Sequence, residues 1–293
     1  MLYRRKVILA LLQAFGGELA KTDFQKLLFI FTRMQQKPAF DFVPYRFGCY
    51  SFQAEADRRG LVKQGRLAES ERWKKIDEID YIIKLTPQDR QALNRLVHKY
   101  KYIRGRDLVA EVYRKYPYYA IYSEVVDDIL DSSELKNVES ARPRKENIFL
   151  LTIGYEGLSL EAYLNRLLQY DIRVLCDVRR NPISRKFGFS KSQLKAAVEK
   201  MGMLYMHIPE LGIASGKRKA LSSPSDYTAL FEEYERTTLH EQAEQIKKIC
   251  RLVEKYERVA LTCFEHSHKL CHRSYIANAL TQTDQWKYEV LHI

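Results

Sequence analysis

The feature that most constrains the fold is a regular alternation of short apolar runs and helix-like segments from Ile148 to the last residue. Strand-like runs lie at 148–154, 173–179, 204–209, 258–264 and 288–293. Segments with apolar residues at helical spacing lie between them at 159–169, 191–201, 239–256 and 271–280. This alternation predicts an α/β domain over residues 148–293, with a mostly parallel sheet and helices on both faces.

The first 131 residues follow a different pattern. Helical spacing is found at 2–15, 22–36 and 52–59, with Thr22 and Gln25 as a capping box for the second helix. Strand-like runs at 61–67 and 81–85 predict a β-hairpin, and Thr86 and Pro87 are typical of the start of a further helix. This order predicts an α+β winged-helix-like domain that binds nucleic acid. A small packing domain or a protein-binding module would have the same pattern.

Residues 132–147 are polar, contain Pro143 and predict a linker between the two domains. No run approaches 18 apolar residues, and the first residues lack a signal-peptide cleavage site, so we expect no membrane partner and a cytoplasmic location. The five cysteines are odd in number and are expected to be reduced thiols.

Positive charge is concentrated in two segments. The formal net charge is +12, and residues 1–75 carry 15 Lys and Arg against 7 Asp and Glu. Residues 177–220 carry 10 basic against 3 acidic side chains. Two basic patches favour an anionic partner, and we expect nucleic acid, DNA rather than RNA. The tyrosines around Tyr113 to Tyr122 could pack the domains together or form the interface of a homodimer.

Ionisable side chains follow the predicted strands. The strand ends carry Tyr155, Asp177 with Arg179 and Arg180, His207 with Glu210, and Cys263 with Glu265. Ligands of open α/β sheets bind outside the carboxyl ends of the strands, so these groups predict a binding site. Asp177, Glu210 and Glu265 are candidates for acid–base catalysis, although Asp177 and Arg179 could equally form an ion pair that holds the loop.

Phosphate recognition is the role expected for the basic residues of this region. His272 and Arg273 stand at the start of a predicted helix, where free N–H groups and an Arg fork suit an anion. Arg273 could instead pair with Glu265 or Asp177. The second basic patch contains Arg179, Arg180, Arg185, Lys186 and Lys191 beside Phe187 and Phe189, a combination that suits a nucleic-acid backbone and a base.

Cys263 admits two further interpretations. A strand end before a helix lowers the pKa of a thiol, so Cys263 could act as a nucleophile, or it could be a buried structural residue. Zinc could be held by residues drawn from Cys263, His266, His268, Cys271 and His272. Because Lys269 and Arg273 are unfavourable beside a cation, we expect no metal and no other cofactor.

Several motifs of the second half occur together and in order: TIGYEG (152–157), SLEAYL (159–164), LCDVRRNPISRKFGFS (175–190), LYMHIPELG (204–212), CFE (263–265) and LCHRSYIA (270–277). In these the chain resembles the family known as domain of unknown function 488. The resemblance implies an α/β domain whose shared polar positions are Asp177, Arg179, His207, Glu210, Glu265, Cys271, His272 and Arg273. It implies no established reaction.

The first half resembles the Panacea-type antitoxin domain in two short segments, 25–29 (QKLLF) and 45–51 (YRFGCYS). Gly48-Cys49 stands where that family usually has Gly-Pro. The resemblance implies a toxin–antitoxin or phage-defence setting.

Together these features predict a DNA- or nucleotide-directed protein with a hydrolase site in the α/β domain, acting on a glycosidic or phosphodiester bond. One alternative is a regulator or sensor that binds nucleic acid without turnover. A second is a cysteine-dependent enzyme of the rhodanese or phosphatase kind, with Cys263 as its nucleophile.

Overall fold

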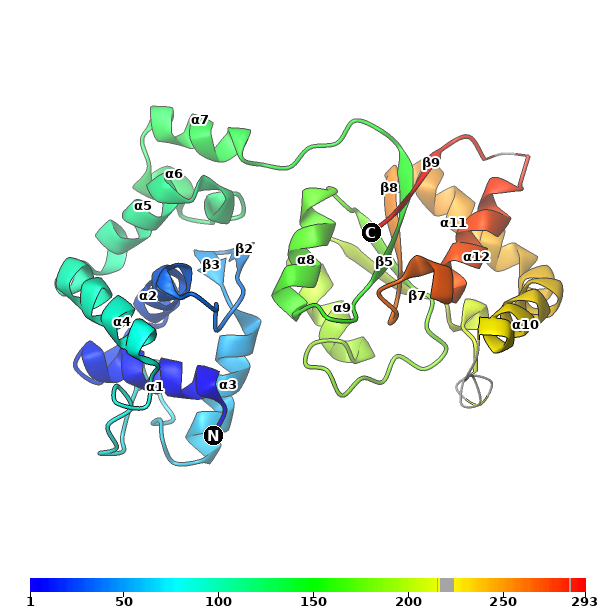
Figure 1. Cartoon of the computed structure of the whole chain (residues 1–293). Coiled ribbons are helices and arrows are strands. Elements are labelled where there is room, and N and C mark those ends of the chain that lie inside the picture. Colours follow the sequence, from blue (N-terminus) through cyan, green and yellow to red (C-terminus); the bar gives the residue numbers. More distant parts are fainter. Residues whose placement is uncertain (215, 217–223, 285) are drawn as a thin grey trace. The chain divides into compact units, whose positions relative to one another are not determined.

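The computed structural model describes residues 1–214, 216, 224–284 and 286–293 (Figure 1). These residues form two compact units, Met1–Arg142 and Pro143–Ile293. Among the residues described, no helix is both long enough and apolar enough to cross a bilayer.

The C-terminal unit is built on a five-stranded sheet. Its strands are β5 (Phe149–Gly154), β6 (Val174–Asp177), β7 (Leu204–His207), β8 (Arg258–Cys263) and β9 (Glu289–His292). Their spatial order is β7-β6-β8-β5-β9, and every neighbouring pair is parallel. The α/β class predicted from the alternation is therefore confirmed, and the strands' carboxyl ends lie on one edge.

Helices flank this sheet on both sides. The helices are α8 (Leu160–Gln169), α9 (Lys191–Lys200), α10 (Pro224–Tyr234), α11 (Ala243–Tyr256) and α12 (His272–Thr281). Figure 1 shows α8 and α9 on one side and the other three on the opposite side. Short turns η2 (Pro209–Leu211), η4 (Glu235–Leu239) and η5 (His268–Leu270) complete the unit.

One helix of this unit was not predicted, and another begins later than expected. Helix α10 buries Leu230, Phe231 and Tyr234 in the core, although no element was expected between 210 and 238. The helix predicted from residue 239 begins at Ala243, because residues 235–239 form a π-helical turn. Lys217, Arg218 and Lys219 of the second basic segment lie outside the described residues.

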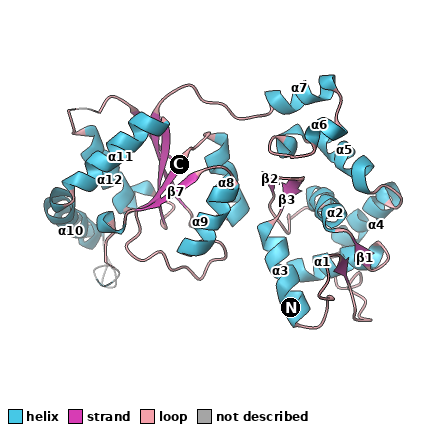
Figure 2. Cartoon of the chain, turned by 180° about the vertical axis from the view of Figure 1, so that it is seen from behind, coloured by secondary structure: helices cyan, strands magenta, loops and turns pink. Residues whose placement is uncertain are grey.

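The N-terminal unit is mostly helical with two small sheets (Figure 2). Its helices are α1 (Tyr3–Ala14), α2 (Lys21–Met34), α3 (Phe52–Lys63), α4 (Pro87–Tyr100), α5 (Gly105–Lys115), η1 (Pro117–Ala120), α6 (Val126–Ile129) and α7 (Ser132–Ser140). Its strands are β1 (Glu18–Leu19), β2 (Val43–Tyr45), β3 (Gly48–Tyr50) and β4 (Trp73–Lys74). Thr86 caps α4 as predicted, accepting a hydrogen bond from the Asp89 amide.

Two local predictions for this unit were wrong. The hairpin expected from 61–67 and 81–85 does not form, because α3 continues past Gly60 to Lys63 and buries Leu61. Strand β4 pairs with β1 instead. The capping box at Thr22 is also absent, since α2 begins at Lys21 and the Gln25 side chain accepts from the Ser51 amide at 3.0 Å.

The two Panacea-like segments are joined by buried hydrogen bonds. Lys26 on α2 is 1% exposed, and its ammonium donates to the carbonyls of Phe47 and Cys49 in the β2–β3 turn. Gln25 also holds Ser51 at the end of the same turn. Burial lowers the pKa of Lys26. These bonds fix the turn on α2, so the two segments form one structural feature.

The segment expected to be a linker is partly helical. Residues 132–140 form α7, whose capping box joins Asp131 and Glu134. Arg114 of α5 pairs with Glu134 at 2.5 Å, which ties α7 to the first unit. The irregular part of the segment is therefore shorter than the range 132–147.

Candidate functional site

A polar pocket lies at the carboxyl ends of the sheet in the C-terminal unit. Its volume is about 290 Å³. It is lined by residues that follow β5, β6 and β8 and by the start of α12: Tyr155, Arg179, Arg180, Asn181, Ile183, Ser184, Arg185, Ile213, Cys263, Phe264 and His272. The strand-end edge predicted from the sequence is thus where side chains from several elements surround one cavity.

Asp177 and Arg179 form a buried ion pair beside this pocket. The Arg179 Nε donates to Asp177 Oδ1 at 2.8 Å, and its Nη2 donates to Oδ2 at 2.5 Å. Tyr205 donates from its hydroxyl to Oδ2 at 2.7 Å. Asp177 has no exposed surface, so it is available to position neighbours but not to reach a substrate.

The Nη1 group of Arg179 is also engaged. Its Nη1 donates to the Tyr155 hydroxyl at 2.9 Å and to the Phe189 carbonyl at 2.8 Å. The Tyr155 ring stacks on Phe189 with centroids 4.2 Å apart. Burial alone would lower the pKa of Arg179, but hydrogen bonding and charge from Asp177 outweigh it and raise that pKa. Arg179 therefore holds the loop after β6, as the alternative sequence interpretation allowed.

His207 and Lys186 support the loop that follows β6. His207 lies 2.9 Å from the Arg179 carbonyl through Nε2 and 2.9 Å from Lys191 Nζ through Nδ1. Because the carbonyl can only accept, Nε2 carries the proton and Nδ1 accepts from Lys191. Lys186 donates to the Tyr155 carbonyl at 3.0 Å. Both side chains thus stabilise the loop.

Arg180 and Arg185 are the two lining arginines with exposed side chains. Arg180 Nη1 donates to the Pro209 carbonyl over a long distance, 3.4 Å. Arg185 donates to no residue that the structure describes. Glu210 lines a neighbouring pocket, which also includes Arg180, rather than the pocket that contains Cys263. Glu265 is not among the residues that line either of these two pockets.

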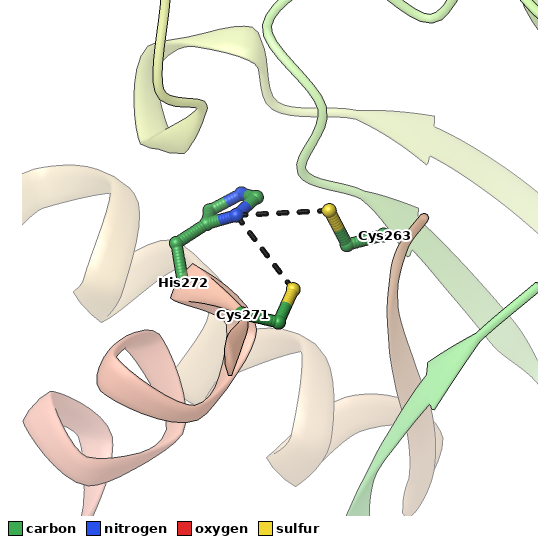
Figure 3. Close-up of side chains that lie close together, drawn as sticks. All are labelled: Cys263, Cys271 and His272. Carbon is green, nitrogen blue, oxygen red and sulfur yellow. Dashed lines mark hydrogen bonds between the residues drawn. The ribbon is translucent and has the colours of Figure 1, made fainter. Parts of the chain in front are cut away.

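Two thiol sulfurs and an imidazole nitrogen lie close together beside the pocket (Figure 3). Cys263 ends β8, Cys271 precedes α12, and His272 is the first residue of α12. His272 Nδ1 lies 3.6 Å from Cys263 Sγ and 3.8 Å from Cys271 Sγ. All three residues are buried, with exposures of 2% or less. Among the described residues this is the group of side chains that could hold a metal ion.

Glu265 lies next to these three residues. The Cys263 thiol donates to Glu265 Oε2 at 3.1 Å, and the Glu265 side chain is partly exposed. Burial raises the pKa of the Cys271 thiol, and the neighbouring Cys263 raises it further. Cys263 and His272 thus line the pocket, and the Cys271 thiol and the Glu265 carboxylate lie next to them.

Arg273 holds the loop that carries Glu265. Its guanidinium has no exposed surface and donates to the Glu265 carbonyl at 2.5 Å and to the His266 carbonyl at 2.9 Å. We therefore assign Arg273 to loop positioning, and not to the phosphate binding expected from the sequence. Gly154 is required opposite, because a Cβ there would lie 1.8 Å from the Glu265 carbonyl oxygen.

Some residues of this region were not picked out by the sequence analysis. Asn181 and Ser184 line the pocket, and Tyr205 bonds Asp177. Asn181 and Ser184 belong to the basic segment after β6, so the positive charge of that segment indicates where they lie. The role of Tyr205 depends on strand pairing between β6 and β7, which no local pattern reveals.

No curated protein and no solved structure matches this chain. Residues 159–280 match the family model described as Domain of unknown function DUF488, which confirms the predicted resemblance of the C-terminal half to that family.

Proposed function

We propose that the C-terminal unit is a hydrolase that acts on a phosphate-bearing, base-containing substrate, either a nucleotide or DNA. The observation that carries the proposal is one pocket that is lined both by two exposed arginines and by buried reactive side chains. Arg180 and Arg185 line the same cavity as Cys263 and His272. Positive side chains at the mouth would hold an anion, and the reactive groups would lie beside the bond to be cleaved.

The mouth of the pocket supports recognition of both parts of such a substrate. Arginine offers a planar fork that matches phosphate, and Asn181 and Ser184 add neutral hydrogen-bonding groups. Phe264 is 44% exposed at the same cavity and presents an aromatic ring to a base. The glycosidic and phosphodiester bonds of a nucleotide both lie between these two kinds of contact.

The base of the pocket supplies the groups for proton transfer. Glu265 is partly exposed and lies beside Cys263, so it is the carboxylate that we assign to acid–base work. Asp177 acts indirectly, because its ion pair with Arg179 fixes the chain that leads into Arg180. Of the carboxylates expected to be catalytic, Glu265 retains that role in the proposal. Asp177 has a positioning role instead.

The first half enters the proposal as a DNA-binding unit in a phage-defence or toxin–antitoxin setting. Several of its basic side chains are engaged in ion pairs, among them Arg4 and Arg5 with Asp57. Its available positive charge is therefore smaller than the sequence count suggests. Support for this part rests on the composition and on the resemblance of the two joined segments.

The experiment is incubation of the purified chain with plain DNA, base-modified DNA and free nucleotides, with DNA analysed on denaturing gels before and after hot alkali. Breaks before alkali indicate phosphodiester cleavage, and breaks only after alkali indicate base removal. Arg180→Gln and Arg185→Gln should weaken substrate binding, whereas the charge-matched control Arg251→Gln, on the exposed side of α11, should not. Equal activity of all three variants, or no turnover of any substrate, would refute the proposal.

A second candidate is cysteine-dependent chemistry through Cys263. The observation in its favour is the 3.6 Å distance from Cys263 Sγ to His272 Nδ1, which is loose for a nucleophile and base but typical of unliganded sites. Under this mechanism Cys263→Ser removes turnover, and a covalent adduct on Cys263 is detectable by mass spectrometry. A regulator would instead bind DNA or nucleotide and leave it intact.

A further inference from the structure

We propose that Cys263, Cys271 and His272 form a zinc-binding site at the base of the pocket. Zinc in proteins prefers thiolate sulfur and imidazole nitrogen in tetrahedral geometry. The three donor atoms, two sulfurs and one nitrogen, all lie within 4.8 Å of one another. Figure 3 shows the side chains of Cys263 and Cys271 both directed toward the imidazole of His272.

The distances match a tetrahedral site. Zinc–sulfur bonds of about 2.3 Å and zinc–nitrogen bonds of about 2.0–2.1 Å place a sulfur and a nitrogen about 3.5 Å apart in a tetrahedron. The observed separations from His272 Nδ1 are 3.6 Å to Cys263 and 3.8 Å to Cys271. An ion could therefore enter between these atoms with only small shifts of the side chains.

The orientation of His272 also suits a ligand. Its Nε2 lies 3.0 Å from the Val178 carbonyl, which can only accept a hydrogen bond. The proton is therefore on Nε2, and the lone pair of Nδ1 points to the two sulfurs. Metal-binding histidines commonly donate their second ring nitrogen to a backbone carbonyl in this way.

The surrounding residues fix the ligands before an ion arrives. Cys263 is held by the sheet, and Cys271 and His272 by the first turn of α12. The terminal nitrogens of Arg273 donate to loop carbonyls, while its buried Nε has no hydrogen-bond partner among the described residues. Two thiolates and one zinc ion sum to zero charge, which makes their burial acceptable.

His266 and His268 are not part of this site. The ring of His268 stacks on His292 with centroids 4.2 Å apart, and its Nδ1 lies 3.3 Å from the Ser274 hydroxyl. His266 is exposed. The site therefore has three protein ligands, and a fourth position remains for water, as in catalytic zinc sites. Cys263 and His272 line the pocket, so we place that position on the pocket side.

Metal binding stands on this geometry alone, whereas a catalytic role for the ion rests on the proposed function. In that role zinc lowers the pKa of its bound water. Glu265 would take a proton from this water, and the resulting hydroxide would form a bond to the phosphorus or to the sugar carbon as the bond to the leaving group breaks. The proton would then pass from Glu265 to the leaving group. Glu265 Oε2 lies 3.1 Å from Cys263 Sγ, which places this carboxylate close to the ligands.

The test uses the full chain, purified with a reductant, loaded with zinc or cobalt alone, and freed of excess metal. We expect one zinc per chain by elemental analysis, sulfur and nitrogen neighbours by zinc X-ray absorption, and the charge-transfer absorption of a thiolate-bound tetrahedral cobalt ion. Cys263→Ser, Cys271→Ser and His272→Gln should each lower zinc affinity by roughly tenfold or more. Cys250→Ser, a buried cysteine outside the site, should bind as the unmodified chain does.

The proposal is overturned if the reduced, unmodified chain retains no stoichiometric zinc, if X-ray absorption shows no sulfur neighbour, or if the three ligand variants bind as tightly as Cys250→Ser. Should a ligand variant fail to fold, the spectra of the unmodified chain still decide. Zinc bound without turnover of any substrate would refute the proposed hydrolase and keep the metal site. Turnover by protein that binds no zinc would refute the metal site and keep the hydrolase.

Discussion

Replacing Asp177 by Asn tests whether this carboxylate positions its neighbours or takes part in the reaction. Both oxygens of Asp177 accept from Arg179, Oδ1 from Nε and Oδ2 from Nη2. Either orientation of an Asn amide would therefore place its NH₂ against a guanidinium donor. The pair is buried, with side-chain exposures of 7% and 0%. Removing one partner of a buried ion pair costs about 3–5 kcal/mol of unfolding free energy.

The assay is urea unfolding followed by the fluorescence of Trp286, the tryptophan of the C-terminal unit, in a Trp73→Phe background. The control is Arg173→Gln, which removes an ion pair with Asp171 whose arginine is 53% exposed. That change should cost no more than about 1 kcal/mol. Adding Arg179→Met to Asp177→Asn should recover part of the loss, because no buried charge is then left unpaired.

The reasoning fails if the unfolding free energy of Asp177→Asn lies within about 1 kcal/mol of that of the unmodified chain. If that same stable variant lost all turnover, Asp177 would have to be restored as an acid–base group. A large loss of stability with turnover retained at low temperature would support the positioning role.

Three other predictions can be tested with single variants. Gly154→Ala should displace the Glu265 carbonyl, since the added Cβ would lie 1.8 Å from that oxygen; we expect a loss of about 1–3 kcal/mol, measured by urea unfolding, and weaker zinc binding. Lys26→Met should leave two turn carbonyls unpaired and lower the melting temperature of the N-terminal unit, with a cost of about 1–3 kcal/mol; an unchanged melting temperature would contradict this. Burial lowers the pKa values of both His268 and His292, so the neutral forms are favoured in the folded state. The stability they contribute is complete above about pH 6.5 and falls as the pH drops below it. His268→Phe should make the unfolding free energy less dependent on pH in pH-jump unfolding. An unchanged pH dependence would show that the two histidines do not cause it.

The parallel sheet could be predicted because its pattern is local and repeated. Each strand is a short apolar run, each helix has its own spacing, and a regular alternation has few other folds available to it. The same argument placed the polar strand ends on one edge, where the pocket lies. The predicted hairpin of the first unit does not form, because α3 continues through Gly60 to Lys63. Burial of Leu61 outweighs the cost of one glycine within a helix.

The roles of individual site residues were harder to predict, because strand order and side-chain direction decide them. Asp177 and Arg179 are two residues apart, and the turn after β6 brings the guanidinium back onto the carboxylate. Cys263 and His272 are nine residues apart and meet only because α12 begins beside the end of β8. His268 lies between them in sequence but turns outward to His292. The composition of this segment indicates a site, but it does not show which of the Cys and His side chains lie close together.

The charges around the pocket indicate how an anion and a metal ion could share it. Asp177 neutralises Arg179, and Arg273 is fully buried with both terminal nitrogens on loop carbonyls. Zinc with two thiolates adds no net charge. The attraction for phosphate is therefore left to Arg180 and Arg185, which are exposed and can be removed without disturbing the base of the pocket. Substrate affinity should thus depend on salt and on these two arginines, whereas zinc affinity should depend on neither.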